Sequence, residues 1–281
     1  MQKILIQFDT DPQPSSFDRV VAIDSGVDQL FSYSGITPEN VTGLVHGAIF
    51  TRGPADLKNT AIFVGGSHAD SGEKLMKAIG STFFGPMRVS VMMDSNGCNT
   101  TAAAAIASAR RHIDLRGVRA VVLGATGPVG LRAAELLALE GASVTLVSRT
   151  QQRADDACRS IASRVELSEL TGVAAATQEE FVAVCRDSTI VVAAGAAGVC
   201  FLPEGTIGQL PGLKLAIDLN AVPPLGIADV AVNAKAAEKN GCVCYGALGV
   251  GGLKMKVHRA SVASLFETND RIVGTREIYA L

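Results

Sequence analysis

The chain has few aromatic residues and no excess of either charge. Among its 281 residues there is no tryptophan and there are only 3 tyrosines, so an extended surface for stacking nucleic-acid bases is not expected. The 25 basic and 27 acidic residues leave a formal net charge of -2, which gives no general attraction for nucleic acid or for an anionic membrane. These absences favour a small-molecule partner.

The 6 cysteines and 4 histidines lack the spacing of a metal site. Cys242 and Cys244 lie two apart, so on a strand they would point to one side, as ordinary core thiols do. No apolar run approaches the roughly 20 residues that span a bilayer, and the alanine-rich stretch 102–109 stops at Arg110 and Arg111. The first residues lack the apolar core of a signal peptide. We therefore expect a cytoplasmic protein with reduced thiols and no metal.

The hydrophobic content of 48% permits a sizeable core, and the length is typical of one or two domains. Apolar runs at residues 4–8, 61–64 and 89–92 predict strands, and the segment 71–79 predicts a helix between two of them. This alternation indicates an α/β domain in the first part of the chain. A helix-forming alanine-rich segment then ends at a break, residues 114–117, where we place the crossing to a second domain.

The strongest local pattern is a strand, a glycine turn and a helix, which begin at Val118. Gly124, Gly127 and Gly130 have the spacing G-x-x-G-x-x-G, in which glycines bring the backbone and a helix N-terminus close to a pyrophosphate. This spacing departs from the commoner G-x-G-x-x-G and is weak evidence alone. A second strand pattern at 141–148 follows at the distance that a βαβ unit requires, so we predict a Rossmann unit.

The end of this second strand indicates which dinucleotide binds. An acidic residue there binds the 2′-hydroxyl of NAD, whereas a basic residue accommodates the 2′-phosphate of NADP. The chain has Ser148, Arg149 and Thr150 at this point, Arg153 adds a positive charge, and no carboxylate appears before Asp155. We therefore predict NADP, with NAD as a weaker cosubstrate. The alternative for Arg149 is a solvated arginine at the start of a helix.

Two later strand patterns also end in residues suited to a ligand crevice. The run 189–198 ends in small residues that admit a nicotinamide ribose, and Asp218 and Asn220 follow another strand where an open α/β sheet builds its crevice. The predicted cofactor-binding residues are Gly124, Thr126, Gly127, Pro128, Val129, Gly130, Ser148, Arg149, Thr150, Arg153, Ala194, Gly195, Ala196, Asn220 and Gly249.

Several separate segments carry a family resemblance. They are Gln7-Phe-Asp-Thr-Asp, Phe50-Thr-Arg-Gly, Thr60-Ala-Ile-Phe-Val-Gly-Gly, Phe84-Gly-Pro, Asp94-Ser-Asn-Gly-Cys-Asn-Thr-Thr-Ala-Ala-Ala, Gly127-Pro-Val-Gly, Asn220-Ala-Val-Pro-Pro-Leu-Gly-Ile and Gly246-Ala-Leu-Gly-Val-Gly-Gly-Leu-Lys-Met-Lys-Val-His-Arg-Ala. In these segments the chain resembles the bacterial NADP-dependent methylenetetrahydromethanopterin/methylenetetrahydrofolate dehydrogenases of one-carbon metabolism. The similarity extends from Gln7 to Tyr279.

The resemblance implies an N-terminal α/β catalytic domain over residues 1–112 and a doubly wound Rossmann NADP-binding domain over residues 113–252. The C-terminal segment 253–281 is expected to return to the first domain, and the active site is expected in the interdomain cleft. Relatives in this fold are commonly oligomers, so we expect a homo-oligomer. Tetrahydromethanopterin and tetrahydrofolate both remain open as the reduced pterin substrate.

The implied reaction is reversible hydride transfer from the methylene carbon of the pterin to the nicotinamide, which leaves a methenyl cation. No proton need move in this step, so the enzyme must align two carbons, exclude water and stabilise the spreading positive charge. The sequence contains neither G-x-S-x-G nor H-E-x-x-H, and this reaction needs neither.

Polar residues after two strands of the first domain are expected to face the substrate. Gln7, Asp9 and Asp11 follow the first strand and can hydrogen-bond the pterin ring; solvated loop carboxylates are the alternative. A second polar cluster precedes the alanine-rich helix, and ordinary N-capping is the alternative for its residues Asn99 and Thr100. This cluster consists of Asp94, Asn96, Asn99, Thr100 and Thr101.

The last group follows a glycine-rich segment, expected as a loop, in which Gly249, Gly251 and Gly252 permit close backbone approach. On the helix that follows, Lys254 and His258 share a face. Either lysine can contact the substrate, with solvated helix charges as the alternative. The predicted catalytic residues are Lys256, Asp94 and Asn96. The predicted substrate-binding residues are Gln7, Asp9, Asp11, Asn99, Thr101, Lys254 and His258.

Two other functions are compatible with parts of this sequence. Asp218-Leu-Asn-Ala-Val-Pro-Pro is also similar to the Rossmann domains of shikimate dehydrogenases and glutamyl-tRNA reductases. Such an enzyme would need an acid/base lysine in the first domain, and no setting suggests one for Lys3, Lys58, Lys74 or Lys77. The second is a non-catalytic pterin- or nucleotide-binding protein, which would bind the cofactor without hydride transfer.

Overall fold

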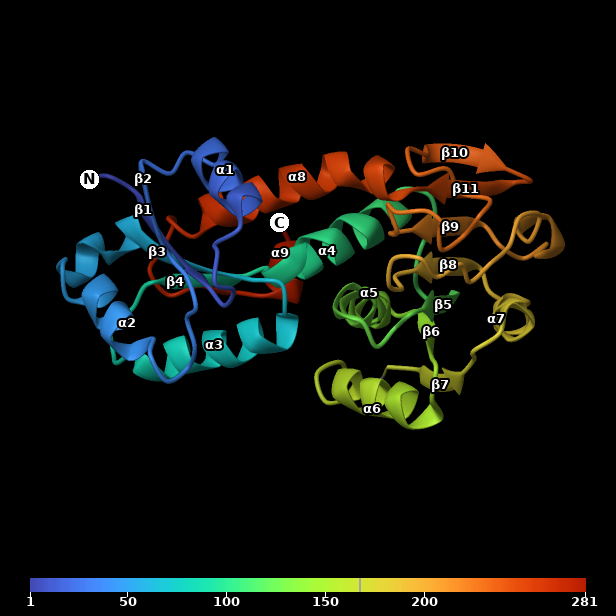
Figure 1. Ribbon diagram of the computed structural model, residues 1–281, viewed down its shortest axis with the longest axis horizontal. Helices are drawn as coiled ribbons and strands as arrows, with labels where there is room; N and C mark the ends of the chain where they lie inside the picture. The colour runs from blue at the N-terminus through green and yellow to red at the C-terminus, as the bar shows by residue number, and fades with distance from the viewer. Residues whose placement is uncertain (167) are drawn as a thin grey trace. The chain divides into compact units, whose positions relative to one another are not determined.

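The structure, a computed structural model, describes residues 1–166 and 168–281 (Figure 1). The chain divides into two compact units: a terminal unit of residues 1–100 and 255–281, and a central unit of residues 101–254. Each unit contains a mainly parallel sheet accompanied by helices, so the predicted α/β class is confirmed. Over both described ranges, no helix combines the length and the apolar character that crossing a bilayer requires.

The sheet of the terminal unit has the strand order β12-β4-β3-β1-β2, and every neighbouring pair is parallel. The predicted strands 4–8, 61–64 and 89–92 are confirmed as β1, β3 and β4, with their ends displaced by one residue. The strands are β1 (Ile4–Asp9), β2 (Gln29–Tyr33), β3 (Thr60–Gly65), β4 (Ser90–Met93) and β12 (Ile272–Val273).

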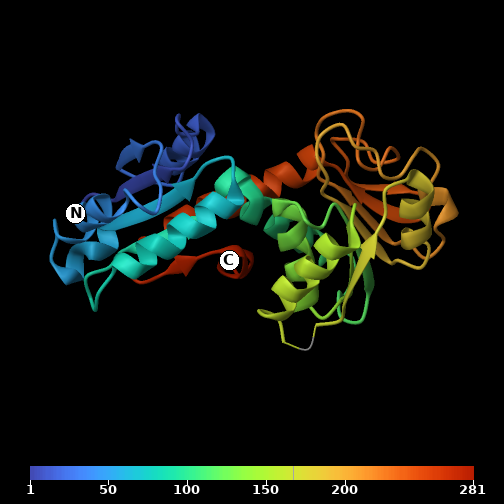
Figure 2. The same cartoon turned by 60° about the horizontal axis from the view of Figure 1, so that its bottom comes forward.

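Helices cover both faces of this sheet (Figures 1 and 2). One face packs against α2 (Thr42–Ile49) and α3 (Ala69–Thr82), with strand side chains such as Phe8 and Ile62 in the shared core. On the other face, Phe63 of β3 stacks against His258 of α8. The helices of that face are α1 (Ser16–Asp24) and the part of α8 (Ala247–Ser264) that follows residue 254, and α9 (Thr275–Tyr279) and the short turns η1 (Pro54–Asn59) and η2 (Ser95–Gly97) complete the unit. The helix α4 (Cys98–Ala109) begins in this unit and continues into the central one.

The central unit contains a seven-stranded sheet of order β10-β11-β9-β8-β5-β6-β7. All pairs are parallel except β10 with β11. The strands are β5 (Arg119–Leu123), β6 (Ser143–Ser148), β7 (Leu170–Ala174), β8 (Ile190–Ala193), β9 (Leu215–Asp218), β10 (Lys235–Lys239) and β11 (Cys242–Tyr245). The helices are α5 (Pro128–Leu139), α6 (Gln151–Ala162), α7 (Gln178–Cys185) and the short η3 (Ile207–Gln209).

The strand order of the central unit reverses at β5. After β5 the chain adds β6 and β7 on one side, and it then returns to add β8 and β9 on the other side of β5. Open α/β sheets bind ligands at the carboxyl ends of the strands where the order reverses. The predicted doubly wound Rossmann fold is thus confirmed, and the glycine turn after β5 lies at this reversal.

Candidate functional site

The glycine turn after β5 is fixed by the close packing of backbone. Gly124 has a φ of +75°, and a Cβ atom there would lie 2.8 Å from the Cα of Gly195. At Gly130, a Cβ atom would lie 2.4 Å from the carbonyl oxygen of Gly124. Gly127 is the N-cap of α5 and Pro128 its first residue, so the first backbone N–H groups of the helix lie beside the turn. The turn therefore has the geometry that receives a pyrophosphate.

A pocket of about 370 Å³ lies at the carboxyl ends of β5, β6, β7 and β8. Its lining includes many of the predicted cofactor residues: Gly124, Thr126, Gly127, Ser148, Arg149, Arg153, Ala194, Gly195 and Ala196. The predicted residues Pro128, Val129, Gly130, Thr150, Asn220 and Gly249 lie outside this lining. The structure thus brings together residues from four separate strand ends in one crevice.

The end of β6 presents positive charge to this pocket and no carboxylate. Ser148 is buried, and its hydroxyl lies 3.3 Å from that of Thr126 in the glycine turn. Arg149 and Arg153 are exposed and line the pocket, and within the described ranges neither guanidinium forms an ion pair. This arrangement suits the 2′-phosphate of NADP better than the free ribose hydroxyl of NAD.

Asn220 has a local structural role. Its Oδ1 accepts a hydrogen bond from the backbone N–H of Val222 at 3.0 Å, and its Nδ2 donates to the carbonyl of Pro224 at 3.1 Å. The neighbouring carboxylate of Asp218 accepts from the backbone N–H groups of Asn220 and Ile227. Burial raises the pKa of Asp218, although these N–H groups act in the opposite direction. Together these contacts stabilise the loop after β9.

The glycine-rich segment expected as a loop is helical, so that expectation is wrong. The helix α8 begins at Ala247 and includes Gly249, Gly251 and Gly252. A Cβ atom at Gly249 would lie 1.8 Å from the carbonyl oxygen of Ala234, so the close approach at this glycine is to the chain itself. The sequence pattern showed that a close approach was needed, but it did not show what approaches.

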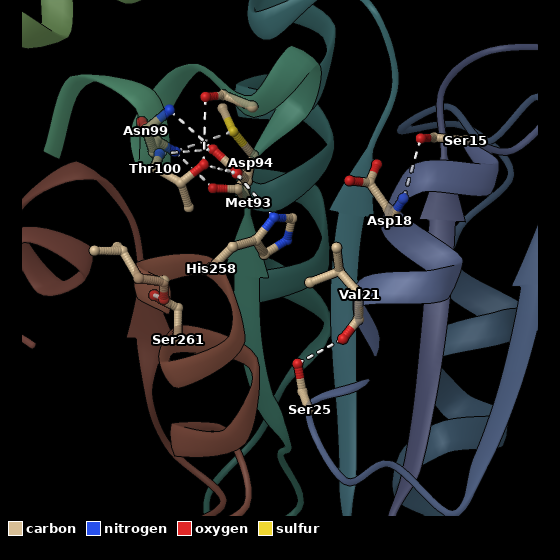
Figure 3. A network of polar contacts seen from close by, with 12 residues as sticks. Ser15, Asp18, Val21, Ser25, Met93, Asp94, Asn99, Thr100, His258 and Ser261 are labelled. Atoms are coloured by element: carbon tan, nitrogen blue, oxygen red, sulfur yellow. Dashed lines mark hydrogen bonds and ion pairs between the residues drawn. The ribbon is translucent and has the colours of Figure 1, made fainter. Parts of the chain in front are cut away.

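In the terminal unit, the carboxylate of Asp94 caps α4 (Figure 3). Its Oδ1 accepts hydrogen bonds from the backbone N–H groups of Asn99 at 2.8 Å and Thr100 at 3.0 Å. Its Oδ2 accepts from the hydroxyl of Thr100 at 2.5 Å and lies 3.9 Å from Nδ1 of His258. Asp94 and His258 are both buried. The N-cap role proposed for Asn99 and Thr100 therefore belongs to Asp94 instead.

The other members of this polar cluster differ in exposure. The Nδ2 of Asn99 donates to the carbonyl of Met93 at 2.6 Å, and its Oδ1 accepts from Thr275 at 2.8 Å, so the side chain joins β4, α4 and α9. Asn96 is exposed and has a φ of +55°, a left-handed conformation that costs energy and is often found at functional sites. Thr101 is half-buried.

Gln7 and Asp9 lie within β1 and do not follow it as predicted, and the carboxylates of Asp9 and Asp11 are joined to neighbouring loops. Asp9 is buried and accepts hydrogen bonds from the backbone N–H groups of Asp11 and Ser15, each at 3.0 Å. Gln7 is also buried and donates to Asp9 at 3.2 Å. Asp11 accepts from the backbone N–H and the hydroxyl of Ser67, both at 3.0 Å. The alternative of solvated loop residues is thus wrong for Gln7 and Asp9, while Asp11 is half-buried.

Known proteins resemble the chain along its whole length. The family model for the N-terminal part of methylene-tetrahydromethanopterin dehydrogenase matches residues 16–96. The chain is 43% identical over 282 residues to the bifunctional protein MdtA of Methylorubrum extorquens, covering 100% of this chain and 98% of that protein. The chain belongs to the methylenetetrahydromethanopterin dehydrogenase family. It is also 32% identical over 277 residues to the NAD(P)-dependent methylenetetrahydromethanopterin dehydrogenase of the same organism, covering 95% and 93% of the two chains.

Solved structures of other dehydrogenases share the fold of this family member. Quinate dehydrogenase from Corynebacterium glutamicum matches with a TM-score of 0.57 and 14% identity, covering 99% of this chain and 98% of that one. Shikimate 5-dehydrogenase from Listeria monocytogenes matches with a TM-score of 0.56 and 14% identity, covering 99% and 96%. At such identity the likeness shows the fold alone.

In this methylenetetrahydromethanopterin dehydrogenase family member, α8 carries the predicted lysines and histidine. Lys254 is half-buried, Lys256 is exposed and His258 is buried. Lys254 and His258 are four residues apart and share a helix face, as predicted, and Lys256 lies on a different one. Of the two lysines, Lys256 is the one whose side chain is exposed.

Sequence reasoning missed one wall of the dinucleotide pocket. The missed lining residues are Val147, Ala175, Ala176, Gln178, Phe181, Val199, Cys200 and Phe201. Most follow β7 or lie beyond the small residues after β8. The short, half-exposed β7 has a weak hydrophobic pattern, so the turn after it was difficult to predict from the sequence. The capping pattern Thr177-x-x-Glu180 before a helix was the signal available there.

Proposed function

We propose that the chain is a dehydrogenase that transfers a hydride to NADP from the methylene carbon of methylenetetrahydromethanopterin or methylenetetrahydrofolate. The pterin product is the methenyl form. The observation that carries this proposal is the 32% identity, over 95% of the chain, to a protein named NAD(P)-dependent methylenetetrahydromethanopterin dehydrogenase, combined with an intact dinucleotide pocket. The structural likeness to shikimate and quinate dehydrogenases supports only the fold, so it does not favour their reactions over this one.

The central unit fits NADP through its own residues. The positive φ of Gly124 and the open N-terminus of α5 provide backbone N–H groups for a pyrophosphate. Arg149 and Arg153 provide two cations for a 2′-phosphate, and Ser148 leaves that position without a carboxylate. The bound dinucleotide would supply the hydride acceptor. The absence of a carboxylate at the end of β6 supports NADP as the preferred form, with NAD as a weaker cosubstrate.

The polar residues of the terminal unit are proposed to bind the reduced pterin. Five of the predicted catalytic and substrate-binding residues keep exposed or half-buried side chains, and of these we propose that Lys256, Asn96 and Asp11 contact the substrate; the other two are Thr101 and Lys254. The contacts of Asp94 and Asn99 hold the start of α4 and the loop that contains Asn96. Asp94, predicted as catalytic, is therefore proposed as a positioning residue. Because hydride transfer moves no proton, orientation and exclusion of water are the main tasks of these residues.

A cytoplasmic homo-oligomer is also part of the proposal. All six cysteines are free thiols, which is typical of a reducing compartment. The exposed apolar side chains of Val20 and Ile23 on α1 line a hollow with Leu30 of the edge strand β2, which offers a surface that a second copy would cover. Sedimentation analysis of the purified protein tests this; a single monomeric species at working concentration would contradict it.

The decisive experiment is an assay of NADPH formation by near-ultraviolet absorbance. The purified chain is incubated with NADP and either methylenetetrahydromethanopterin or methylenetetrahydrofolate, and both reactions are repeated with NAD. We expect turnover with at least one pterin and a higher kcat/KM for NADP than for NAD. Binding of NADP without turnover on either pterin would replace the proposal with a non-catalytic binding protein.

A further inference from the structure

The side chain of Gln178 reaches across the rim of the dinucleotide pocket. It comes from the first residue of α7, and its Nε2 donates a hydrogen bond of 3.4 Å to the carbonyl oxygen of Cys200, in the segment that follows β8. Gln178 and Cys200 both line the pocket. The contact therefore joins two walls that are 22 residues apart in the sequence.

The backbone that carries Gln178 is held in place by the N-terminus of α7. The hydroxyl of Thr177 accepts a hydrogen bond from the N–H of Glu180 at 3.3 Å. The carboxylate of Glu180 accepts from the N–H groups of Ala176 at 2.7 Å and Thr177 at 3.0 Å. These N–H groups lower the pKa of Glu180, so the carboxylate stays charged and keeps the turn closed. This capping box fixes where the Gln178 side chain starts.

The backbone that carries the carbonyl of Cys200 is also held in place by hydrogen bonds and ring packing. The next two backbone N–H groups, of Phe201 and Leu202, both donate to the carbonyl of Gly226, at 2.9 and 3.1 Å. The ring of Phe201 packs edge-to-face on Phe181 with 5.0 Å between centroids. It also lies against Gly195, where a Cβ atom would come within 2.3 Å of the ring. Cys200 thus presents its oxygen from a backbone that has little freedom to move.

This carbonyl determines which way the amide of Gln178 faces. A backbone carbonyl can only accept, so the nitrogen of the amide must point toward it and the amide oxygen must point elsewhere. The amide then offers an acceptor, Oε1, and a second N–H on Nε2. An amide placed in this way matches the edge of adenine, whose exocyclic amine donates and whose adjacent ring nitrogen accepts.

The adenine end of NADP is the part that would lie near Gln178. The 2′-phosphate is on the adenosine ribose, and the pocket's two arginines follow β6. The strand β7 is the neighbour of β6 in the sheet, and α7 follows β7 directly. The base attached to that ribose is therefore closer to the turn after β7 than the nicotinamide is.

We propose that Gln178 recognises the adenine base of the cofactor, with its orientation set by the carbonyl of Cys200. This inference rests on the proposed function, because it needs the pocket to bind NADP. An oxo group in place of the exocyclic amine would face the amide oxygen with a second acceptor. Gln178 thus selects adenine over hypoxanthine and takes no part in hydride transfer.

The test compares NADP with its hypoxanthine analogue, by calorimetric Kd and by kcat/KM. Because the analogue would place an acceptor against the amide oxygen of Gln178, the wild type should bind NADP about tenfold more tightly than the analogue. In Gln178→Ala and Gln178→Met this ratio should fall to about one. The control is Gln152→Ala, an exposed glutamine of α6 that bonds to Asp156 and lies outside the pocket lining; its ratio should equal the wild-type ratio.

The outcomes separate this inference from the proposed function. Equal wild-type affinity for the two nucleotides, or a tenfold ratio that persists in both Gln178 variants, would overturn the role of Gln178 while leaving the dehydrogenase intact. A tenfold ratio without pterin turnover would support Gln178 and contradict the dehydrogenase. If the wild type binds neither nucleotide, both proposals are overturned. Thermal unfolding of each variant verifies that a changed ratio does not come from a misfolded protein.

Discussion

The hydroxyl of Thr100 donates to the buried carboxylate of Asp94 across 2.5 Å, and the same carboxylate accepts the backbone N–H groups at the start of α4. A single side chain thus satisfies donors that would otherwise be buried without partners. Asp94→Ala should therefore lower the free energy of unfolding by roughly 2–4 kcal/mol, measured by urea denaturation. Asp94→Asn keeps one carbonyl-type acceptor and should lose about half as much.

Asp70 provides the control for this prediction. Asp70 lies in the first turn of α3, and its side chain is exposed. The N-cap residue of this helix, His68, forms no side-chain hydrogen bond to the free N–H groups of the turn. Asp70→Ala should change the free energy of unfolding by less than about 0.5 kcal/mol, as surface substitutions usually do. Equal losses in Asp70→Ala and Asp94→Ala would show that the capping interpretation of Asp94 is wrong.

Two glycines of the turn after β5 should respond differently to the same change. A Cβ atom at Gly130 would lie 2.4 Å from a backbone carbonyl oxygen, whereas at Gly127 the nearest backbone oxygen would be 3.4 Å away. Because backbone cannot rotate aside, Gly130→Ala should lower the free energy of unfolding by about 3 kcal/mol. Gly127→Ala should lower it by under about 1 kcal/mol. Urea denaturation of both variants gives the comparison, and a tolerated Gly130→Ala would contradict the described packing.

The Rossmann fold was predictable because its signals are local and repeated. Strand runs such as Val144–Val147 are fully or nearly fully apolar, and the glycine turn lies directly after a buried strand. The strand β2 had no such signal, since its side chains are alternately exposed and half-buried at the sheet edge. A short edge strand forms because it pairs with the neighbouring strand, and its own sequence need not show a hydrophobic pattern.

The parts of the site that could be predicted are those in which a residue is placed by the strand or turn next to it in the sequence. The arginines after β6 are placed in the pocket by the strand that precedes them. The role of Asp94 as a cap was missed because the sequence offers several polar residues there, and only the fold shows which one meets the free N–H groups. Gln178 and Cys200 were missed because their contact joins loops after two different strands.

The two arginines of the pocket should separate NADP from NAD. Arg149→Ala and Arg153→Ala each remove one cation from the site proposed for the 2′-phosphate, so each should raise KM for NADP by about 10- to 100-fold. KM for NAD should change by less than about threefold, because NAD has no 2′-phosphate. Arg159→Ala is the matched control, since Arg159 is exposed on the same helix and pairs with Asp156. Parallel losses with both cofactors would argue against phosphate recognition.

Ser148→Asp should shift the preference in the opposite sense. Ser148 is buried beside Thr126 of the glycine turn, at the end of β6. A carboxylate there would repel a 2′-phosphate and accept a hydrogen bond from a free 2′-hydroxyl. The ratio of kcat/KM for NADP to that for NAD should fall at least about tenfold. Ser148→Asn, which is similar in size but uncharged, should lower the ratio much less, and an unchanged ratio in Ser148→Asp would place the 2′ position elsewhere.

Asp229 should make the stability of the central unit depend on acid pH. Burial raises the pKa of Asp229, but hydrogen bonds from Lys239 Nζ at 2.7 Å and from the backbone N–H groups of Gly205 and Ile207 hold it below the ordinary value of 3.8. A carboxylate with a lowered folded pKa stabilises the protein above its unfolded pKa, and this stabilisation is lost as pH falls through the folded pKa. The free energy of unfolding of the wild type should therefore decline below about pH 4. The side chain of Asp229→Asn cannot titrate, so the free energy of unfolding of this variant should be lower than that of the wild type at neutral pH and should decline less steeply in acid. Urea denaturation between neutral and acid pH measures both curves. Parallel curves would mean that Asp229 has the same pKa in the folded and unfolded chain, which is incompatible with its three hydrogen-bond donors.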